Sequence, residues 1–490
     1  MEFSWWNWNW IINIILLSNL VFILVMIFYE RSSPGHTITW TVVMTFLPWI
    51  GFLLYIFLGA GLGPFTRKQL EEKKIKSVVY TQGVKKQIEA LKSDHIRYHE
   101  PALYQNNELV HFNLLHNRSL YTQNNKVEIF THGVDKFEAL ERDLLAAKHT
   151  INMCYFIFRG DETGERILDI LCQKAQEGVE VRLMYDAVGN AFIRKRIFNR
   201  LKKAGGKVCL FFPAAFGLKF ITLRLNYRNH RKIVVIDGQT CYTGGMNVGD
   251  EYKGLHPRVH PWRDTHIRLQ GSCVETYQGI FLSDWQYASK EKLSAEQLKR
   301  FFPGPISAGT VGVQVVESGP DNESNDIELS MIKLLSLAKD HIYLQSPYFI
   351  PDDPFLEAIE MAIGSGVDVR IMLPGVWDKA YAYHGNMAYV DKLLKMGVKV
   401  YLYHGFIHSK SIVVDGLWST IGTTNLDIRS FALHFEVNSF IYDSKLARQN
   451  EEIFFNDMKH STLVTREWYN NRGWFTTALE SVLLLFSPIL

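Results

Sequence analysis

Residues 230–238 read HRKIVVIDG, and residues 408–416 read HSKSIVVDG. Each stretch has a histidine, a lysine two positions later and an aspartate five positions after the lysine. The 17 histidines of the chain would give about 0.05 matches to this pattern by chance. One copy alone would also fit a plain β-hairpin with a polar start. Two copies predict a repeated functional motif in a duplicated fold.

The sequence around the two motifs repeats in the same order. GVEVRLMYD at 178–186 is echoed by GVDVRIMLP at 366–374, and strand-like residues follow an amphipathic stretch at both 151–158 and 342–350. Apolar runs of four to six residues alternate with helical stretches, which is typical of an α/β fold. We therefore expect two similar α/β domains, each a mainly parallel or mixed sheet flanked by helices.

The N-terminal part of the chain differs from the rest. Residues 1–62 hold six of the twelve tryptophans and only three charged residues. The runs 11–29 and 38–62 carry no charge, and ~20 residues suffice to cross a bilayer as a helix. No basic residue precedes the first run, which argues against a signal peptide. The sequence therefore predicts two transmembrane helices ahead of the duplicated body.

The charges that flank these runs predict an orientation. Five basic residues lie within 67–76, whereas the turn between the runs has only Arg31. Because basic residues favour the cytoplasmic side of a membrane, residue 63 onward is expected in the cytoplasm. The predicted parts are a transmembrane hairpin (1–62), a juxtamembrane linker (63–119), and two domains (120–295 and 310–490).

Composition excludes several classes of protein. With 47% hydrophobic and 21% charged residues in 490, the chain is not disordered. Its five cysteines show no metal-ligand or disulfide spacing, so we expect no metal site. A net charge of +3 is too small to predict a nucleic-acid partner.

The motif spacing suggests how the side chains meet. Histidine and lysine two apart lie on the same face of a strand, and an Asp-Gly pair favours a hairpin turn. A chain reversal centred near 238.5 would set Asn247 opposite His230. A reversal near 416.5 would set Asn425 opposite His408.

The residue types in each cluster suit phosphoryl transfer. Lysine and asparagine donate hydrogen bonds to phosphate oxygens, and imidazole acts as nucleophile or as acid and base. Two clusters that face each other would form one site with two histidines. We expect Asp237 and Asp415 to hold the turn or the lysine rather than to react.

The motifs and their surroundings resemble the phospholipase D superfamily. GGMNVGDEY, WRDTHIRLQG, QSPYFIP and GTTNLDIRSF are similar to the bacterial cardiolipin synthases with two N-terminal spans. The resemblance implies that two phosphatidylglycerol molecules, as donor and acceptor, are condensed into cardiolipin and glycerol without a metal or other cofactor. It also implies that six motif residues are catalytic: His230, Lys232, Asp237, His408, Lys410 and Asp415.

The resemblance also implies individual roles. One histidine, which we expect to be His230, attacks the first lipid, and the other moves protons. Lys232, Lys410, Asn247 and Asn425 would stabilise the transition state. A downstream carboxylate would orient each histidine: Asp264 for His230, and Glu436 for His408.

Alternatives to this function remain open at this point. They are a phospholipase D hydrolase and a non-catalytic membrane scaffold, whereas the small net charge and the two predicted spans argue against a nucleic-acid phosphodiesterase. Three segments could contact the bilayer: a basic stretch (192–204), an apolar stretch (211–224) and the apolar tail (479–490). Each could equally pack on the protein itself. The sequence does not define the oligomeric state.

Overall fold

The computed structural model describes residues 5–29, 34–55, 64–75, 78–92, 96–190, 197–212, 227–256 and 259–485. The chain divides into two compact units. The first unit comprises residues 1–68 with 214–227, and the second comprises 69–213 with 228–490. Both copies of the repeated motif lie in the second unit.

The first unit contains a helical hairpin. Its helices are α1 (Trp5–Tyr29), α2 (Pro34–Phe46) and α3 (Ile50–Leu54). The amide of Asn19 on α1 donates to the carbonyl of Met44 on α2 at 2.9 Å. In the parts of the chain that the structure describes, no helix combines the length and apolar character needed to cross a membrane.

The prediction of one unbroken helix over 38–62 is wrong for the described part of that run. Helix α2 ends at Phe46, and α3 begins at Ile50. Pro48 lies in the break, where it has no N–H for the helical hydrogen bond, and Trp49 adopts a φ of 66°. Residues 56–63 lie outside the described part of the chain.

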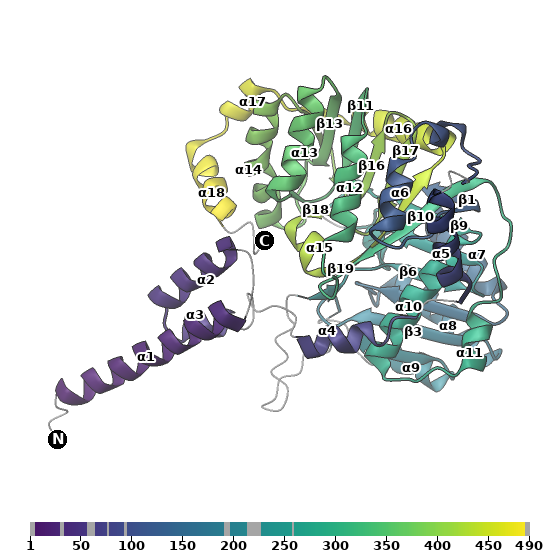
Figure 1. Ribbon diagram of the computed structural model, residues 1–490, viewed down its shortest axis with the longest axis horizontal. Helices are drawn as coiled ribbons and strands as arrows, with labels where there is room; N and C mark the ends of the chain where they lie inside the picture. The colour runs from purple at the N-terminus through teal and green to yellow at the C-terminus, as the bar shows by residue number, and fades with distance from the viewer. Residues whose placement is uncertain are drawn as a thin grey trace. The chain divides into compact units, whose positions relative to one another are not determined.

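The second unit is built on one 16-stranded sheet, in which 15 strands follow one path and the short β5 (Arg228–Asn229) pairs with β19 off that path (Figure 1). The first half supplies, in spatial order from the outer edge, β4 (Lys207–Phe211), β3 (Glu180–Asp186), β2 (Thr150–Tyr155), β6 (Ile233–Ile236), β7 (Thr240–Gly244), β9 (His266–Gln270) and β1 (Thr122–Phe130). The second half continues with β10 (Val311–Ser318), β19 (His434–Tyr442), β17 (Trp418–Gly422), β16 (Ser411–Val414), β11 (His341–Gln345), β13 (Asp368–Pro374), β14 (Lys399–Tyr403) and β20 (Ser461–Leu463).

The strand orders of the two halves mirror each other about the antiparallel β1–β10 pair. In each half two pairings are parallel, β2–β3–β4 and β11–β13–β14, and the pairings toward the centre are antiparallel. The fold is therefore α/β with a mixed sheet, as the duplicated motifs predict. The expected mainly parallel sheet is limited to the outer strands.

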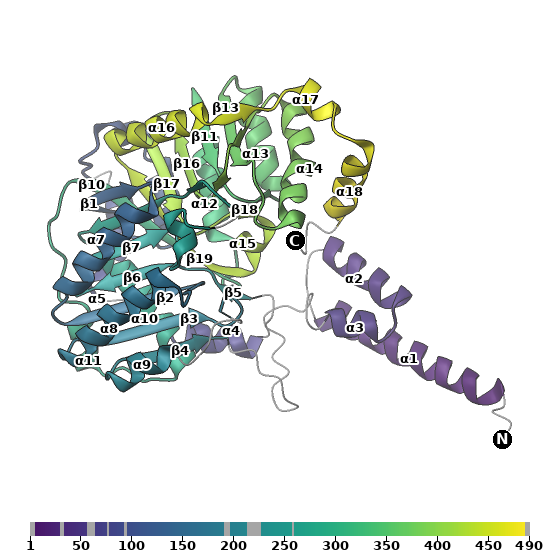
Figure 2. The same cartoon turned by 180° about the vertical axis from the view of Figure 1, so that it is seen from behind.

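Helices cover both faces of this sheet (Figures 1 and 2). In the first half, α8 (Glu162–Gln176) packs on β3, and α10 (Cys273–Ser289) packs on β2, β4 and β6. The remaining helices of the two halves are α7 (Gly133–Ala146), α9 (Phe198–Lys203), α11 (Ala295–Phe301), α12 (Asp326–Ser336), α13 (Asp353–Gly364), α14 (Ala380–Met396), α15 (Ile428–Ala432) and α16 (Ser444–Lys459). Each half has its own buried apolar cluster.

Part of the predicted linker and the described part of the C-terminal segment pack on the second half. The predicted linker 63–119 contains α4 (Pro64–Glu71), α5 (Val78–Lys92) and α6 (Glu108–Leu115), and buried Leu103 and Leu109 belong to the apolar cluster of the second half. The tail forms α17 (Arg466–Asn470) and α18 (Trp474–Leu485), and α18 packs on α14. Of the segments 192–204 and 211–224, only 197–204 and 211–212 are described.

Both motif aspartates sit in the hairpin turns. Asp237 has a φ of 51° and Asp415 a φ of 53°, and each precedes a glycine with positive φ. The carboxylate of Asp237 accepts three backbone N–H groups at the start of β2, at 2.7–2.8 Å. Asp415 accepts the three equivalent groups at the start of β11. Each aspartate therefore ties its hairpin to the neighbouring strand.

The hairpin register differs by one residue from the prediction. Ile233 pairs with Thr243, and Ser411 pairs with Ile421. These registers set position 230 opposite 246 and position 408 opposite 424, rather than opposite Asn247 and Asn425. The aspartate leaves the ladder because its carboxylate is bound to the next strand, which makes the loop one residue longer.

We expect Asp237→Asn to destabilise the protein by about 1–3 kcal/mol, because one carboxylate oxygen becomes a donor that faces a backbone N–H. Asparagine keeps the tolerance for positive φ, so the change isolates this contact. The midpoint of thermal unfolding should fall by several degrees. Asp353→Asn, whose side chain is 84% exposed, is the control. A variant that unfolds like the parent but has lost activity would instead assign Asp237 a direct chemical role.

Candidate active site between the two halves

Two short strands cross from one half of the second unit to the other. In the first half, β5 (Arg228–Asn229) pairs with β19 of the second half. In the second half, β15 (Phe406–Ile407) likewise pairs with β8 (Trp262–Arg263) of the first half. The motif histidines come directly after these strands. His230 N donates to the carbonyl of Phe435 at 3.0 Å, and His408 N donates to that of Arg263 at 2.7 Å.

These crossings exchange the carboxylates that hold the histidines. His230 Nδ1 lies 2.7 Å from Glu436 Oε1, and His408 Nδ1 lies 2.7 Å from Asp264 Oδ2. The sequence-based assignment of Asp264 to His230 and of Glu436 to His408 is therefore wrong. Each carboxylate comes directly after the two residues that pair with the other half's short strand, so it reaches the histidine that follows that strand.

The two carboxylates are buried and held in place. The backbone N–H of Thr265 donates to Asp264 Oδ1 at 2.7 Å, and the hydroxyl of Thr423 donates to Glu436 Oε2. A Cβ at Gly245 would lie 1.9 Å from Asp264 Oδ1. Glycine is therefore required at 245 for Asp264 to reach His408, whereas the corresponding position 423 carries the threonine that binds Glu436.

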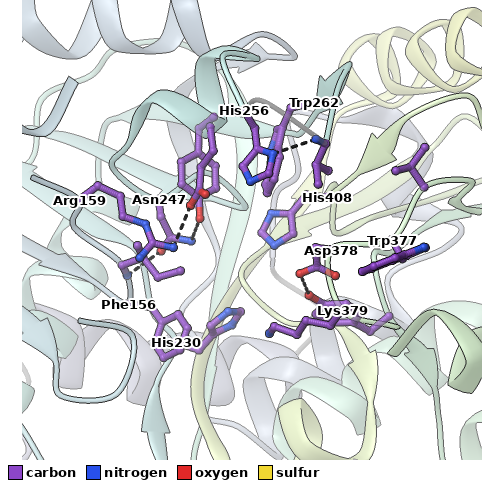
Figure 3. Close-up of a pocket in the computed structure, with 16 residues that line it drawn as sticks. Phe156, Arg159, His230, Asn247, His256, Trp262, Trp377, Asp378, Lys379 and His408 are labelled. Carbon is purple, nitrogen blue, oxygen red and sulfur yellow. Dashed lines mark hydrogen bonds and ion pairs between the residues drawn. The ribbon is translucent and has the colours of Figure 1, made fainter. Parts of the chain in front are cut away.

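Both histidines line one cavity of about 660 Å³ (Figure 3). The first half contributes Phe156, Ile157, Arg159, His230, Asn247, Glu251, Tyr252, His256, Val259 and Trp262, and the second half contributes Tyr348, Val376, Trp377, Asp378, Lys379 and His408. The cavity is thus completed only when the halves come together, and its wall is rich in aromatic side chains. The structure unites the two motifs in one site, as the sequence predicts.

Burial keeps both imidazoles neutral at neutral pH. Burial and the charge of the motif lysine together lower the pKa of His408 to about 4 and that of His230 well below its usual value. Nδ1 of each ring faces a carboxylate, so the proton is assigned to Nδ1 and Nε2 keeps its lone pair. Burial raises the pKa of Glu436 above its usual value, against the opposing effect of Lys232 and the Thr423 hydroxyl, so its ionised carboxylate is a stronger acceptor for the Nδ1 proton.

The motif lysines are buried beside the histidines. Lys232 Nζ donates to the carbonyl of His230 at 2.7 Å, and Lys410 Nζ donates to that of His408 at 2.6 Å. Burial lowers the pKa of Lys232 to about 8 and that of Lys410 to about 7, against the opposing effect of the buried carboxylates. Buried ammonium groups with such low pKa values favour an anionic ligand.

The remaining predicted residues differ in whether they line the cavity. Asn247 lines the cavity, accepts from the N–H of Ile157 at 3.1 Å and donates to the hydroxyl of Tyr252 at 2.8 Å. Asn425 is buried but does not line the cavity. Asp237 and Asp415 do not line it either, and their carboxylates bind backbone N–H groups at the turns.

Two aromatic side chains beside the histidines escaped the sequence analysis. Trp262 lies 5.4 Å from the His408 ring, and His434 lies 5.7 Å from the His230 ring, between ring centroids. Each stands two residues before one of the carboxylates, a shared spacing that could have revealed them. In the described chain, His230, His434 and Glu436 form a group whose ligand atoms lie within 4.8 Å of one another, close enough to hold a metal ion.

Two histidines from duplicated halves, each on a buried carboxylate, define a phosphoryl-transfer protein of the phospholipase D class. The family model described as "Cardiolipin synthase, PLD-like domain" matches residues 140–253 and 331–458, and "Phospholipase_D-nuclease N-terminal" matches residues 11–59. The major cardiolipin synthase ClsA of Bacillus subtilis is 42% identical over 98% of this chain and 99% of its own length. The chain belongs to the cardiolipin synthase family.

Other comparisons agree with this assignment. The cardiolipin synthase of Listeria innocua is 40% identical over 97% of this chain and 98% of its own length. Among solved structures, phosphatidylserine synthase of Haemophilus influenzae matches with a TM-score of 0.56 at 15% identity, over 74% of this chain and 95% of its own. At that identity the likeness concerns the fold alone.

The crossed contacts predict which histidine each carboxylate controls. Glu436→Gln should lower the rate at which diethylpyrocarbonate modifies His230, at least about tenfold, because the ring loses the charge that raises the basicity of Nε2. Asp264→Asn should do the same to His408. Peptide mass spectrometry of briefly treated protein resolves the two sites. The uncrossed arrangement would give the reverse pairing of variant and slowed histidine.

Proposed function

We propose that the protein is a membrane-anchored phosphatidyltransferase that condenses two phosphatidylglycerol molecules into cardiolipin and glycerol. The observation that carries the proposal is the pair of neutral imidazoles, one from each half, that open onto one cavity. Two histidines allow one group to form a covalent bond while the other moves the proton. The cardiolipin synthases of similar sequence support the identity of the substrate.

In the first step Nε2 of His230 attacks the phosphorus of the donor lipid. A P–N bond forms, and the P–O bond to the glycerol headgroup breaks. The glycerol oxygen takes a proton from Nε2 of His408, which the bound phosphate anion helps to hold in its protonated form. Glycerol leaves, and a phosphatidyl-histidine remains on His230.

In the second step the terminal hydroxyl of another phosphatidylglycerol replaces glycerol. His408 takes the proton of that hydroxyl, the oxygen forms a new P–O bond, and the P–N bond to His230 breaks. Cardiolipin leaves, and both imidazoles return to their starting state. Charge that builds on the phosphoryl oxygens is stabilised by the buried ammonium groups of Lys232 and Lys410 and by Asn247, which lines the cavity. Asn425 does not line the cavity and is given no contact with the phosphate.

The supporting residues have separate tasks in this proposal. Glu436 and Asp264 hold the two rings and stabilise the positive charge that develops on them. Asp237 and Asp415 fix the turns that place the motif strands, as their contacts with backbone N–H groups indicate. The aromatic wall of the cavity suits a lipid substrate better than water.

We further propose that residues 11–29 and 38–62 anchor the protein in the bacterial plasma membrane, with the second unit on the cytoplasmic side. Helix α1 exposes large apolar side chains, among them Leu17 at 66% and Phe28 at 80% of their surface. Such exposure costs free energy in water and none in hydrocarbon. The basic residues that follow residue 63 favour the cytoplasmic side.

The first test is a lipid assay of the purified protein in phosphatidylglycerol vesicles without divalent metal. Cardiolipin and free glycerol are expected by mass spectrometry, and both should vanish for His230→Ala and for His408→Ala. Acid quenching during turnover should trap the phosphatidyl group on the peptide that contains His230. A trapped adduct on His408 would reverse the two histidine roles.

Other products would contradict the proposal. Phosphatidic acid with glycerol and no cardiolipin would mean that water is the acceptor and that the protein is a phospholipase D. Absence of every product, with folded protein, would favour a scaffold role.

The buried lysines predict an alkaline limit to activity. Because kcat/KM reports the free enzyme, it should fall as pH rises through about 7 and 8, where Lys410 and Lys232 lose their protons. At saturating lipid the limit should move to higher pH, since a bound phosphate anion holds the ammonium form. In Lys410→Arg the pH at which kcat/KM begins to fall should rise toward about 8, because the remaining titrating lysine is Lys232. An unmoved limit would assign it to another group.

A further inference from the structure

The condensation treats its two lipids differently, whereas the fold is nearly symmetric, so the site must contain an asymmetric element. One lies after the equivalent strands β3 and β13. Asn190 and Asn386 occupy matching places, because each accepts a backbone N–H just beyond β2 or β11, at 2.8 and 2.7 Å. Four residues lead from Asp186 to Asn190, and twelve lead from Pro374 to Asn386.

The eight additional residues of the second half reach the cavity. Trp377, Asp378 and Lys379 lie in this insertion and all line the cavity, and α14 begins directly after Lys379. The described stretch between β3 and Asn190 offers no counterpart to them. Among the residues that the structure describes, the insertion thus adds a cation and the N-terminal end of a long helix to one side of the site only.

Lys379 is placed to bind an anion inside the cavity. Figure 3 shows its side chain extending toward His230. Its ammonium lies 5.6 Å from the ring centroid of Tyr348, and it forms no ion pair with any described residue. The neighbouring carboxylate of Asp378 is bound by the hydroxyl of Tyr348 at 2.6 Å. Arg159, the other non-motif cation with a long side chain in the cavity, already faces Glu251 at 3.5 Å.

The surroundings of His230 carry excess positive charge on this side. Burial lowers the pKa of His434 well below its usual value, and four nearby cations, Arg429, Arg228, Lys232 and Lys379, lower it further. His434 in turn flanks His230, with 5.7 Å between the ring centroids. Glu436, 3.8 Å from His434 Nδ1, and Asp186, which faces Arg228, balance part of this charge. Of the four cations, Lys379 is the one that lines the cavity and can meet a second anion there.

The proposed reaction needs such a second anion site. Each phosphatidylglycerol carries one phosphate, and only the donor phosphate lies between the two histidines and their lysines. The acceptor phosphate does not react, but its charge must enter a partly buried cavity, which is costly without a partner. We propose that Lys379 binds the phosphate of the acceptor phospholipid and thereby selects a phospholipid alcohol over water or a simple alcohol.

A competition between two acceptors tests this inference, which rests on the proposed transferase activity. The full-length protein is assayed in phosphatidylglycerol vesicles with 1,3-propanediol, an alcohol that lacks a phosphate. Cardiolipin and phosphatidyl-propanediol then form from the same phosphatidyl-enzyme in one sample. Their ratio is therefore independent of donor binding and of the fraction of folded protein.

Lys379→Ala should lower the ratio of cardiolipin to phosphatidyl-propanediol by about tenfold or more, as expected for loss of a charged contact. Lys379→Arg, which keeps the cation, should restore much of it. Lys392→Ala is the matched control on α14, the helix that follows Lys379, because its half-exposed side chain faces Asp353 at 3.6 Å on the surface. It should give the ratio of the parent.

The outcomes that would overturn the inference are distinct from failure of the proposed function. An unchanged ratio in Lys379→Ala would show that the lysine does not recognise the acceptor phosphate. If Arg159→Ala lowers the ratio of cardiolipin to phosphatidyl-propanediol and Lys379→Ala does not, Arg159 binds the acceptor phosphate instead. If the parent protein makes no cardiolipin at all, the transferase proposal itself fails.

Discussion

Each motif histidine is held at 2.7 Å by a carboxylate from the opposite half of the chain. This crossed contact makes the two halves interdependent, because neither can position its imidazole alone. It also explains the short exchanged strands, since β5 and β15 must leave their own halves to bring the histidines to these acids. The cavity, the neutral state of the rings and the buried lysines all follow from this exchange.

The burial that makes the contact possible also sets the chemistry. Burial keeps the histidine rings uncharged, so that Nε2 can attack. Burial also lowers the pKa values of the two lysines, so that a bound phosphate anion stabilises their charged form. Near-symmetry gives two equal histidines, but a transfer from donor to acceptor needs unequal surroundings. The insertion that carries Lys379 is one difference between the surroundings of the two histidines. The other is that Trp262 lies beside His408 in the position that His434 occupies beside His230.

Particular residues show how far prediction from the sequence reached. The duplicated motif predicted the two α/β halves and the meeting of His230 and His408, because repeated local patterns fold into repeated local structure. The observed hairpin register differs by one residue from the predicted register. The carboxylate of Asp237 binds three N–H groups at the start of β2, so Asp237 does not pair within its own hairpin. The stretch 63–119 was read as a linker, although Leu103 and Leu109 within it enter the core of the second half.

The sequence by itself determined the motif chemistry, the duplication and the resemblance to the cardiolipin synthases, because these depend on residue type and short spacing. Only the tertiary structure decided which acid serves which histidine, since Glu436 and His230 are 206 positions apart. It alone also placed Lys379 in the cavity. Spacing along the chain fixes contacts within a strand or turn, but contacts between halves depend on how strands pair across the sheet, which no local pattern specifies.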